Sequence, residues 1–214
     1  CNEAAPYLDV GEAMYEGGAV PDAFLIFDAE FRQRYPVGPV APGYAQPDNR
    51  LPRRLRDGFL IKADSIEALA EKCNLDPAAL RRTTDRFNEL ARVGKDTDFQ
   101  RGDFHYDRYY ADHTVGPNPT MRPLVDGPFY AIRVYPGDLG TKGGLVTDAG
   151  ARVLDADGQP IRGLFAAGNT SASVMGPTYP GAGGTIGPAL TFGFLAAETA
   201  AGVDSAALLS EQQQ

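Results

Sequence analysis

The sequence predicts a fold that mixes helices and strands, and three stretches predict it. Residues 163–201 are expected to form a short strand, a glycine-rich loop and an apolar helix in succession. Residues 58–94 predict a short strand followed by two amphipathic helices, and residues 128–162 predict several short strands with a hairpin turn. Such a mixture is typical of the α+β and α/β classes.

The strand–loop–helix stretch carries the strongest signal for a ligand site. Its apolar run Leu164–Ala167 predicts a buried strand, which breaks at Gly168–Asn169. A loop rich in Gly, Ser and Pro follows, with Tyr179 in its middle, and an apolar helix is expected over about Ala189–Ala201. Pro188 suits the helix start, because its missing N–H would be unpaired there. The positive helix end would face an anion or an electron-rich cofactor edge.

The glycines of this loop remove side chains where a ligand would lie: Gly181, Gly183, Gly184 and Gly187. They do not form the dinucleotide fingerprint G-x-G-x-x-G, because the sixth position counted from Gly181 is Ile186. No further strand follows to complete a βαβ unit. On spacing alone, ligand contact and a tightly packed turn both remain open.

Bulk composition excludes several functional classes. The 214 residues, 43% of them hydrophobic, suffice for one large domain or two small ones with a real core. A net charge of −8 disfavours nucleic acid, which needs a basic face. No apolar run reaches the roughly 18 to 20 residues of a membrane span. Cys1 and Cys73 make neither a disulfide framework nor a zinc set, so a cytoplasmic setting is the default.

The chain opens on Cys1 rather than on Met, with no targeting segment. One interpretation is a mature lipoprotein, and the other is a piece of a longer polypeptide. The missing cofactor fingerprint favours the second.

Residues 1–50 are expected to be irregular, apart from a buried strand over Ala23–Asp28. On pattern alone, the tyrosines of this segment are packing residues: Tyr7, Tyr15, Tyr35 and Tyr44.

The next segment predicts a strand over Phe59–Ala63 and then two helices. The first helix is expected over Ile66–Lys72, with an N-cap at Asp64–Ser65. The second is expected from Pro77 to about Val93, with its cap at Asp76. One face of the longer helix gathers Leu80, Thr83 or Thr84, Phe87, Leu90 and Ala91, which indicates a structural role.

Residues 95–127 are polar and are expected to form a solvated loop. The loop contains His105 and His113 with Asp103, Asp107 and Asp112 nearby, but this spacing matches no established ligand pattern, and no metal is expected.

Residues 128–162 predict strands over 129–134, 144–147 and 152–154, and the turn Asp155–Gly158 supports a hairpin. A second Gly-rich loop, residues 136–144, lies between the first two strands and could face the first loop.

Two long runs resemble one family of flavoenzymes. The segments PFYAIRVYPGDLGTKGGL (128–145) and GLFAAGNTSASVMGPTYPGAGGTIGPALTFG (163–193) closely resemble the C-terminal part of bacterial 3-ketosteroid Δ1-dehydrogenases. Three further stretches fit the same family: NEAAPY (2–7), KADSIEALAEKCNLDPAALRRTTDRFNELAR (62–92) and GKDTDFQRG (94–102). The run TYPGAGGTIGPALTFG is specific to it, whereas AAGN is shared with the wider fumarate reductase-like flavoproteins.

The resemblance implies an FAD enzyme of two domains, a Rossmann-type FAD domain and an inserted catalytic domain. Residues 1–135 would then be the later part of the inserted α+β catalytic domain, and residues 136–214 the C-terminal segment of the FAD domain. The N-terminal half of the FAD domain, which carries the fingerprint, is absent from this chain. That half would be its partner, whether cleaved, deleted or separately encoded.

The resemblance also implies 1,2-desaturation of a 3-ketosteroid. Donors on the ketone oxygen stabilise the developing enolate, a base removes the C2 proton, and FAD takes hydride from C1. The resemblance makes the Tyr179 hydroxyl and the Gly183 N–H the donors and Tyr7 the base. Because free tyrosine has a pKa of about 10, a base role requires surroundings that favour phenolate or an assisting partner. A second tyrosine of the family site lies in the missing part.

By the same resemblance, FAD contacts come from both Gly-rich loops and from the N–H groups near Pro188: Gly143, Gly144, Gly168, Asn169, Gly184, Gly187, Ala189 and Leu190. Met175, Leu139 and Phe192 would line an apolar sterol pocket, or they would pack in the core.

Three alternatives stay open. A fumarate reductase-like enzyme would need Arg and His groups to grip a dicarboxylate, whereas the central loops contain Tyr179 and no His. A Δ4-desaturase must also acidify a carbon next to the ketone. The third is a non-catalytic fragment or subunit, inert alone because it lacks the Rossmann half.

Overall fold

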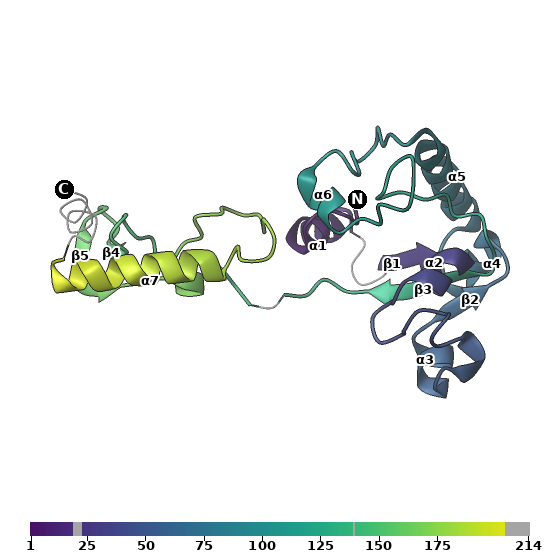
Figure 1. Ribbon diagram of the computed structural model, residues 1–214, viewed down its shortest axis with the longest axis horizontal. Coiled ribbons are helices and arrows are strands. Elements are labelled where there is room, and N and C mark those ends of the chain that lie inside the picture. The colour runs from purple at the N-terminus through teal and green to yellow at the C-terminus, as the bar shows by residue number, and fades with distance from the viewer. Residues whose placement is uncertain (19–22, 139, 204–214) are drawn as a thin grey trace. The chain divides into compact units, whose positions relative to one another are not determined.

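The computed structural model describes residues 1–18, 23–138 and 140–203, and these form two compact units (Figure 1). Unit 1 comprises residues 1–5 and 10–136. Unit 2 comprises residues 6–9 and the described part of 137–214.

A three-stranded antiparallel sheet in the order β1-β3-β2 forms the centre of unit 1. β3 (Phe129–Val134) has the predicted bounds and pairs on either side with β1 (Ala23–Phe27) and β2 (Ile61–Ala63). Register places Leu25 opposite Ile132 and Lys62 opposite Tyr130. β1 stops before the predicted Asp28, since that residue caps the next helix.

Strand β2 is shorter than the predicted Phe59–Ala63. The N–H groups of Phe59 and Leu60 both donate to the Leu55 carbonyl and close the end of the preceding helix, α3 (Arg53–Gly58). Those two residues are therefore unavailable to the sheet.

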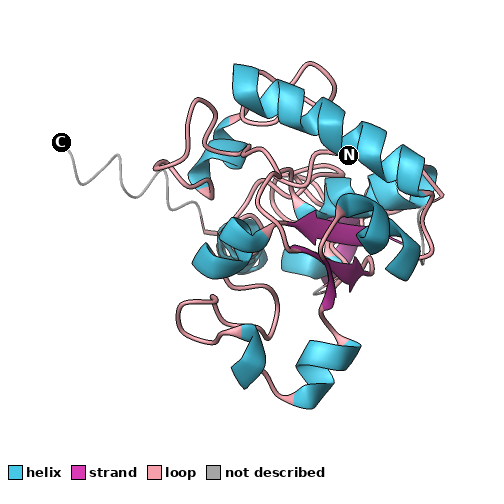
Figure 2. Ribbon diagram, turned by 90° about the vertical axis from the view of Figure 1, so that its right-hand side faces the viewer, coloured by secondary structure: helices cyan, strands magenta, loops and turns pink. Residues whose placement is uncertain are grey.

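Two helices of unit 1 have the predicted bounds, α4 (Ile66–Lys72) and α5 (Pro77–Val93). Their caps are also confirmed, because Ser65 accepts from the Ala68 N–H and Asp76 from the Ala78 N–H. α4 packs against β2, β3 and α5. Figure 2 shows helices surrounding the strands of the sheet.

Short helices occur where the sequence predicted irregular chain: α1 (Tyr7–Glu16), α2 (Ala29–Arg34), α6 (His105–Tyr109) and the 3₁₀ turn η1 (Asp48–Arg50). α3 was not predicted either. These elements are short, and several begin at an Asp or Pro cap instead of an apolar repeat, so helical periodicity gives little signal.

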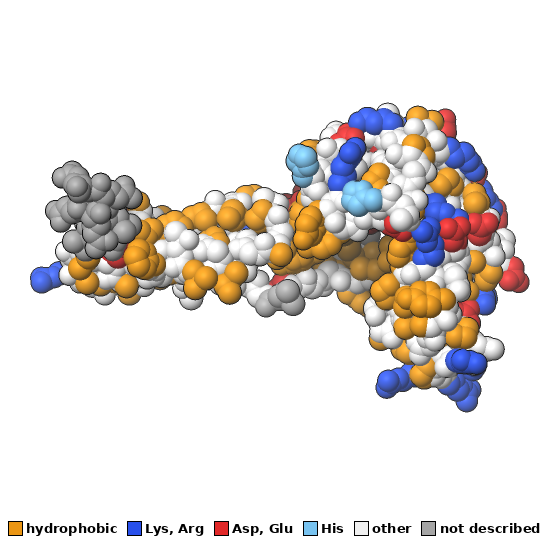
Figure 3. Space-filling view, in the orientation of Figure 1, with side chains coloured by type: hydrophobic (Ala, Val, Ile, Leu, Met, Phe, Trp, Pro, Cys, Tyr) orange, Lys and Arg blue, Asp and Glu red, His pale blue; other side chains and the backbone are white. Residues whose placement is uncertain are grey.

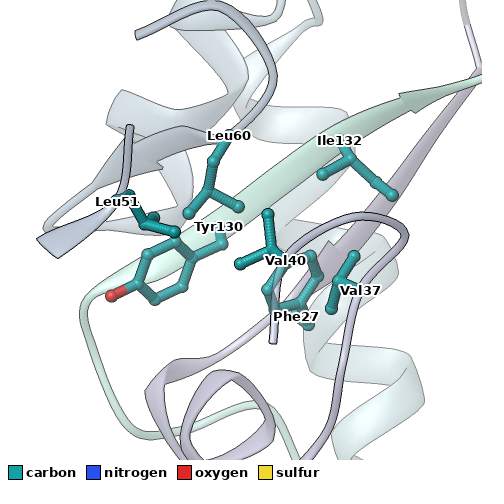
Figure 4. Packing of buried hydrophobic residues seen from close by; sticks show 7 residues of the cluster. All are labelled: Phe27, Val37, Val40, Leu51, Leu60, Tyr130 and Ile132. Carbon is teal, nitrogen blue, oxygen red and sulfur yellow. The ribbon is translucent and has the colours of Figure 1, made fainter. Parts of the chain in front are cut away.

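The apolar core of unit 1 consists of three buried clusters. The first, shown in Figure 4, contains Phe27, Val37, Val40, Leu51, Leu60, Tyr130 and Ile132. The second joins α4 to the sheet through Ala63, Ile66, Leu69, Cys73, Phe129 and Ala131, and the third contains Leu90, Ala91 and Met121. On the predicted face of α5, Thr84, Leu90 and Ala91 are buried and Thr83 is exposed; Asn88, which was not predicted, is also buried.

A polar cluster around Asp48 borders the first apolar cluster. Asp48 accepts from Arg32 Nε at 3.2 Å, from Lys62 Nζ at 2.8 Å and from the Tyr130 hydroxyl at 2.8 Å. The Arg32 side chain is only 4% exposed and also donates to two backbone carbonyls of residues 41–46. Burial would raise the pKa of Asp48, but the hydrogen bonds from Lys62 and Tyr130 outweigh it and hold that pKa below its usual value.

Unit 2 contains a two-stranded antiparallel hairpin, β4 (Arg152–Leu154) and β5 (Pro160–Phe165), the 3₁₀ turn η2 (Gly168–Thr170) and the helix α7 (Ile186–Ala201). The predicted hairpin is confirmed, and Asp155 closes its turn by accepting from the N–H groups of Asp157 and Gln159.

Three predictions for unit 2 are wrong in detail. Residues 144–147 form no strand, because Leu145 and Thr147 make only isolated bridges. β5 ends at Phe165, and its Leu164 is 41% exposed where a buried strand was predicted, since none of the described residues covers that face. α7 begins three residues before Ala189, because the Gly187 N–H donates to the Gly183 carbonyl and starts the helical turn earlier.

Within the described ranges, every helix falls short of the length and apolar character that crossing a bilayer requires.

We expect Asp48→Ala to lower the free energy of unfolding of unit 1 by roughly 2–4 kcal/mol, because buried Arg32 would lose its carboxylate partner. Thermal unfolding of the chain followed by far-UV circular dichroism measures the change. Asp57→Ala removes only exposed ion pairs on α3 and is the control, with an unchanged midpoint expected. Equal midpoints for the two variants would contradict the role assigned to Asp48.

The contribution of Asp48 should also depend on pH. Because the folded-state pKa lies below that of the unfolded chain, the stabilisation is complete above the ordinary Asp pKa of about 3.9 and is lost as pH falls through the lower folded value. Midpoints of the wild-type chain and Asp48→Ala should therefore converge in acid.

Candidate functional site

Two tyrosines from distant parts of the chain lie side by side in unit 2. The ring centroids of Tyr7 and Tyr179 are 5.1 Å apart, and the ring planes are inclined at 50°. Tyr7 is 39% exposed at the start of α1, and Tyr179 is half-buried in the loop before α7. A weak hydrogen bond from Thr178 Oγ1 to Asp9 Oδ1, at 3.4 Å, joins the same two segments. The structure thus brings together two of the residues that the sequence marked for catalysis.

Gly183 presents an available backbone donor in the same loop. Its carbonyl accepts from the Gly187 N–H at 2.8 Å, whereas its own N–H has no acceptor among the described residues. Gly183 has φ +91°, and a Cβ placed there would meet nothing within 4 Å. The amide is therefore free to donate to a ligand.

An open depression runs along this loop and the first turns of α7. Its volume of about 540 Å³ lies in the range of small-molecule sites. The lining carries no charged side chain, and it includes Met175, Pro180, Gly183, Gly184, Gly187 and Phe192. Of the three residues expected to line a sterol pocket, Met175 and Phe192 line this depression, and Leu139 lies outside the described residues.

A second, narrow cavity lies between η2 and the start of α7. Of the expected FAD contacts, Gly168, Asn169 and Gly184 line it, and Lys142 closes it from the other Gly-rich loop. Gly184 and Gly187 line the open depression, whereas Gly143, Gly144, Ala189 and Leu190 line neither cavity.

The two Gly-rich loops touch through their backbones. The Leu145 N–H donates to the Thr170 carbonyl at 2.9 Å, and the Ala172 N–H donates back to the Leu145 carbonyl at 2.8 Å. A Cβ on Gly144 would lie 2.1 Å from the Thr170 oxygen. Packing within the chain is thus sufficient to explain glycine at position 144.

Packing does not explain glycine at position 187. This residue lies in the first turn of α7. A Cβ there would meet nothing within 4 Å among the described residues, so none of them requires the missing side chain. Such open space at a helix start fits the close approach of a cofactor.

Some of the N–H groups expected to contact FAD at the start of α7 already donate within the chain. The Ala189 N–H donates to the Thr185 carbonyl at 3.1 Å, and Thr185 provides no side-chain cap. The positive end of α7 therefore begins at Ile186, one turn ahead of the expected position.

The aspartates near His105 and His113 have other partners. Asp103 pairs with Lys95, Asp107 accepts from the Gly102 N–H and from Asn2, and Asp112 accepts from Tyr35 and Thr114. Hydrogen bonds from Thr114 and Tyr35 lower the pKa of Asp112 to about 2. Within the described parts of the chain, no three His, Cys, Asp or Glu side chains gather as a metal site would require.

Sequence reasoning gave no role to Asp9 and Thr178 beside the tyrosine pair, and it placed Lys142 only within residues 140–144, a loop expected to border the flavin or the substrate. None belongs to a spaced motif, and their contacts arise only from tertiary structure.

Comparison with known proteins agrees with a flavin site. Residues 1–186 match the model of the family described as FAD binding domain. The chain is 48% identical to the 3-oxosteroid 1-dehydrogenase of Mycolicibacterium smegmatis over 92% of its own length and 35% of that protein. It is 44% identical to the 4-oxocyclohexanecarboxylate 2-dehydrogenase of Sinomonas cyclohexanicum, over 94% of the chain and 34% of that protein.

A solved structure is also similar, that of the 3-ketosteroid delta1-dehydrogenase from Sterolibacterium denitrificans in complex with 1,4-androstadiene-3,17-dione. It superimposes with a TM-score of 0.83 at 49% identity, over 92% of this chain and 36% of that one. The chain thus spans about a third of the length of the relatives it matches.

We expect Gly144→Ala to separate the two Gly-rich loops, because its Cβ would overlap the Thr170 carbonyl, and to destabilise unit 2 by about 1–3 kcal/mol. Hydrogen exchange should show lost protection at the Leu145 and Ala172 amides. Gly143→Ala is the matched control, since a Cβ there meets nothing within 4 Å. Equal protection in the two variants would show that the close approach does not hold the loops together.

Proposed function

The chain belongs to the FAD binding domain family, and from that premise we propose that it is part of an FAD-dependent dehydrogenase that desaturates 3-ketosteroids between C1 and C2. The observation that carries the proposal is the contact between Tyr7 and Tyr179, in the loop that also presents the free N–H of Gly183. Tyr179 and Gly183 supply two donors from one glycine-lined loop, and Tyr7 supplies a candidate base from the start of α1. The similar dehydrogenases act on ketones of the same class.

The proposed chemistry assigns a role to each of these groups. The Tyr179 hydroxyl and the Gly183 N–H donate to the ketone oxygen and stabilise the negative charge that develops there. Tyr7, after passing its own hydroxyl proton to an assisting group, accepts as a phenolate the proton that leaves C2. Bound FAD would accept the hydride from C1. The C1–H and C2–H bonds then break, and a double bond forms between C1 and C2.

The residues present fit part of an FAD site. Gly168, Asn169 and Gly184 around the narrow cavity would contact FAD, and so would Gly187 at the open start of α7. Gly143, Gly144, Ala189 and Leu190 remain proposed contacts on the family resemblance. The support is that three of the expected contacts, Gly168, Asn169 and Gly184, line one cavity, and that the space at Gly187 is open among the described residues.

We assign residues 1–135 to the catalytic domain and residues 136–214 to the C-terminal segment of the FAD domain. The two units divide the chain at nearly the same place, except that residues 6–9 belong to unit 2. Support comes from α7, which is largely apolar yet buries none of its residues. Ile186, Leu190 and Phe194 are each more than half exposed, and apolar side chains are visible along this helix in Figure 3. The partner that would cover them is the N-terminal half of the FAD domain.

The lining of the open depression favours a steroid over smaller keto acids. A keto acid or a dicarboxylate requires a cation near its carboxylate, and the lining has none. The same observation disfavours a fumarate reductase-like activity. A Δ4-desaturase would share the apolar lining, and the position of the new double bond in the product distinguishes it.

We expect Tyr179→Phe, in the complete enzyme, to lower kcat on a 3-ketosteroid by about 10²–10³-fold with little change in KM, because the hydroxyl acts on charge that develops in the transition state. Steady-state kinetics with product analysis measure this. Tyr15→Phe, on the exposed side of α1, is the control and should keep wild-type kcat. A Tyr179→Phe enzyme with near-normal turnover would remove Tyr179 from the mechanism.

The isolated 214-residue chain is expected to be colourless and inactive, since unit 2 holds only part of the flavin site. Absorbance near 450 nm and an activity assay test this. A yellow preparation with stoichiometric flavin would refute the assignment of the remaining FAD contacts to a missing half.

A further inference from the structure

Lys142 links the two Gly-rich loops of unit 2. Its Nζ donates to the Gly176 carbonyl at 2.8 Å and to the Thr178 carbonyl. These two acceptors flank Pro177, and the second immediately precedes Tyr179. The ammonium group of a half-buried lysine thus bonds to the backbone of the loop that carries the proposed ketone donors.

The tyrosine loop, residues 173–184, has few other hydrogen bonds that could fix its backbone. Two local turns close on Ser173 and Gly181, through the N–H groups of Gly176 and Gly184. Prolines at 177 and 180 have no N–H to donate. An ammonium group has three donors on one atom, so it can donate to two neighbouring carbonyls that no N–H of the described backbone reaches. The positive charge strengthens both hydrogen bonds.

Lys142 also touches the proposed cofactor region. It lines the narrow cavity together with Gly168, Asn169 and Gly184. Its own loop is anchored next to it, where Leu145 pairs with Thr170 and Ala172. One side chain therefore connects the proposed flavin contacts to the backbone just before Tyr179.

We propose that Lys142 is a positioning residue that sets the place of the Tyr179 hydroxyl and the Gly183 N–H relative to the cofactor site. The catalytic part of this inference rests on the proposed function. Lys142 acts through the loop and touches no reacting atom. A displaced donor loses mainly transition-state stabilisation, so the effect should appear in kcat more than in KM.

The test uses the complete enzyme with its FAD. Lys142→Met keeps the length of the side chain and removes its donors, and we expect kcat per bound FAD to fall about 10- to 100-fold. KM and FAD content should stay near wild-type values. Lys142→Arg restores donors and charge and should recover part of kcat. Arg162→Met, at an exposed position of β5, controls for the loss of a positive charge.

Hydrogen exchange of the peptide covering residues 173–184 is measured in the same variants, without substrate. Faster exchange in Lys142→Met, with recovery in Lys142→Arg, is expected because the lysine holds this backbone. Wild-type kcat in Lys142→Met would overturn the proposal. Loss of FAD with unchanged kcat per bound FAD would also overturn it, because Lys142 would then be a cofactor ligand.

The two proposals fail in different ways. If the wild-type enzyme does not desaturate 3-ketosteroids, the proposed function is wrong, and the exchange measurement alone decides whether Lys142 holds the loop. Unchanged exchange in that case overturns the positioning role, and faster exchange supports it.

Discussion

Unit 2 depends on the close approach of two backbone segments, where Gly144 faces Thr170 with no room for a side chain between them. The paired hydrogen bonds of Leu145 follow from this approach, since its N–H and carbonyl reach Thr170 and Ala172 only at backbone distance. The Lys142 side chain extends from the same loop, and its Nζ donates to the Thr178 carbonyl. Thr178 contacts Asp9, two residues after Tyr7. A series of contacts thus connects the close approach at Gly144 with the tyrosine pair.

The elements predictable from sequence are those in which several local signals agree. α4 and α5 combine an N-cap with helical spacing of apolar residues, and β3 combines β-branched and aromatic residues with clear flanks. α2 and α6 are too short for a period to show. Leu164 illustrates another limit, because an apolar run predicts that a strand will be covered but does not say by which part of the protein.

The residues of the candidate site were predicted from the sequence on other grounds than the helices and strands. Tyr179 and Gly183 lie in one loop, so their proximity follows from the chain itself. Tyr7 was identified by family resemblance alone, and no spacing rule places it against Tyr179, because only the fold brings residue 7 to residue 179. Lys142 gave no signal of its own, since a single lysine in a Gly-rich loop looks like any surface lysine. The structure also distinguishes two kinds of glycine. Packing requires Gly144, because a Cβ there would overlap Thr170, whereas no described neighbour requires Gly187.

Burial is divided unequally between the two units, and this has a thermodynamic consequence. All three apolar clusters belong to unit 1, whereas the buried hydrophobic residues described in unit 2 are Ala151, Val153 and Ala166. A single two-state free energy does not describe such a chain, because unit 2 opens at a lower cost than unit 1. A ligand that binds only the closed form of unit 2 then raises its stability in proportion to the logarithm of ligand concentration. Release of the flavin and loosening of the tyrosine loop are, on this view, one coupled equilibrium.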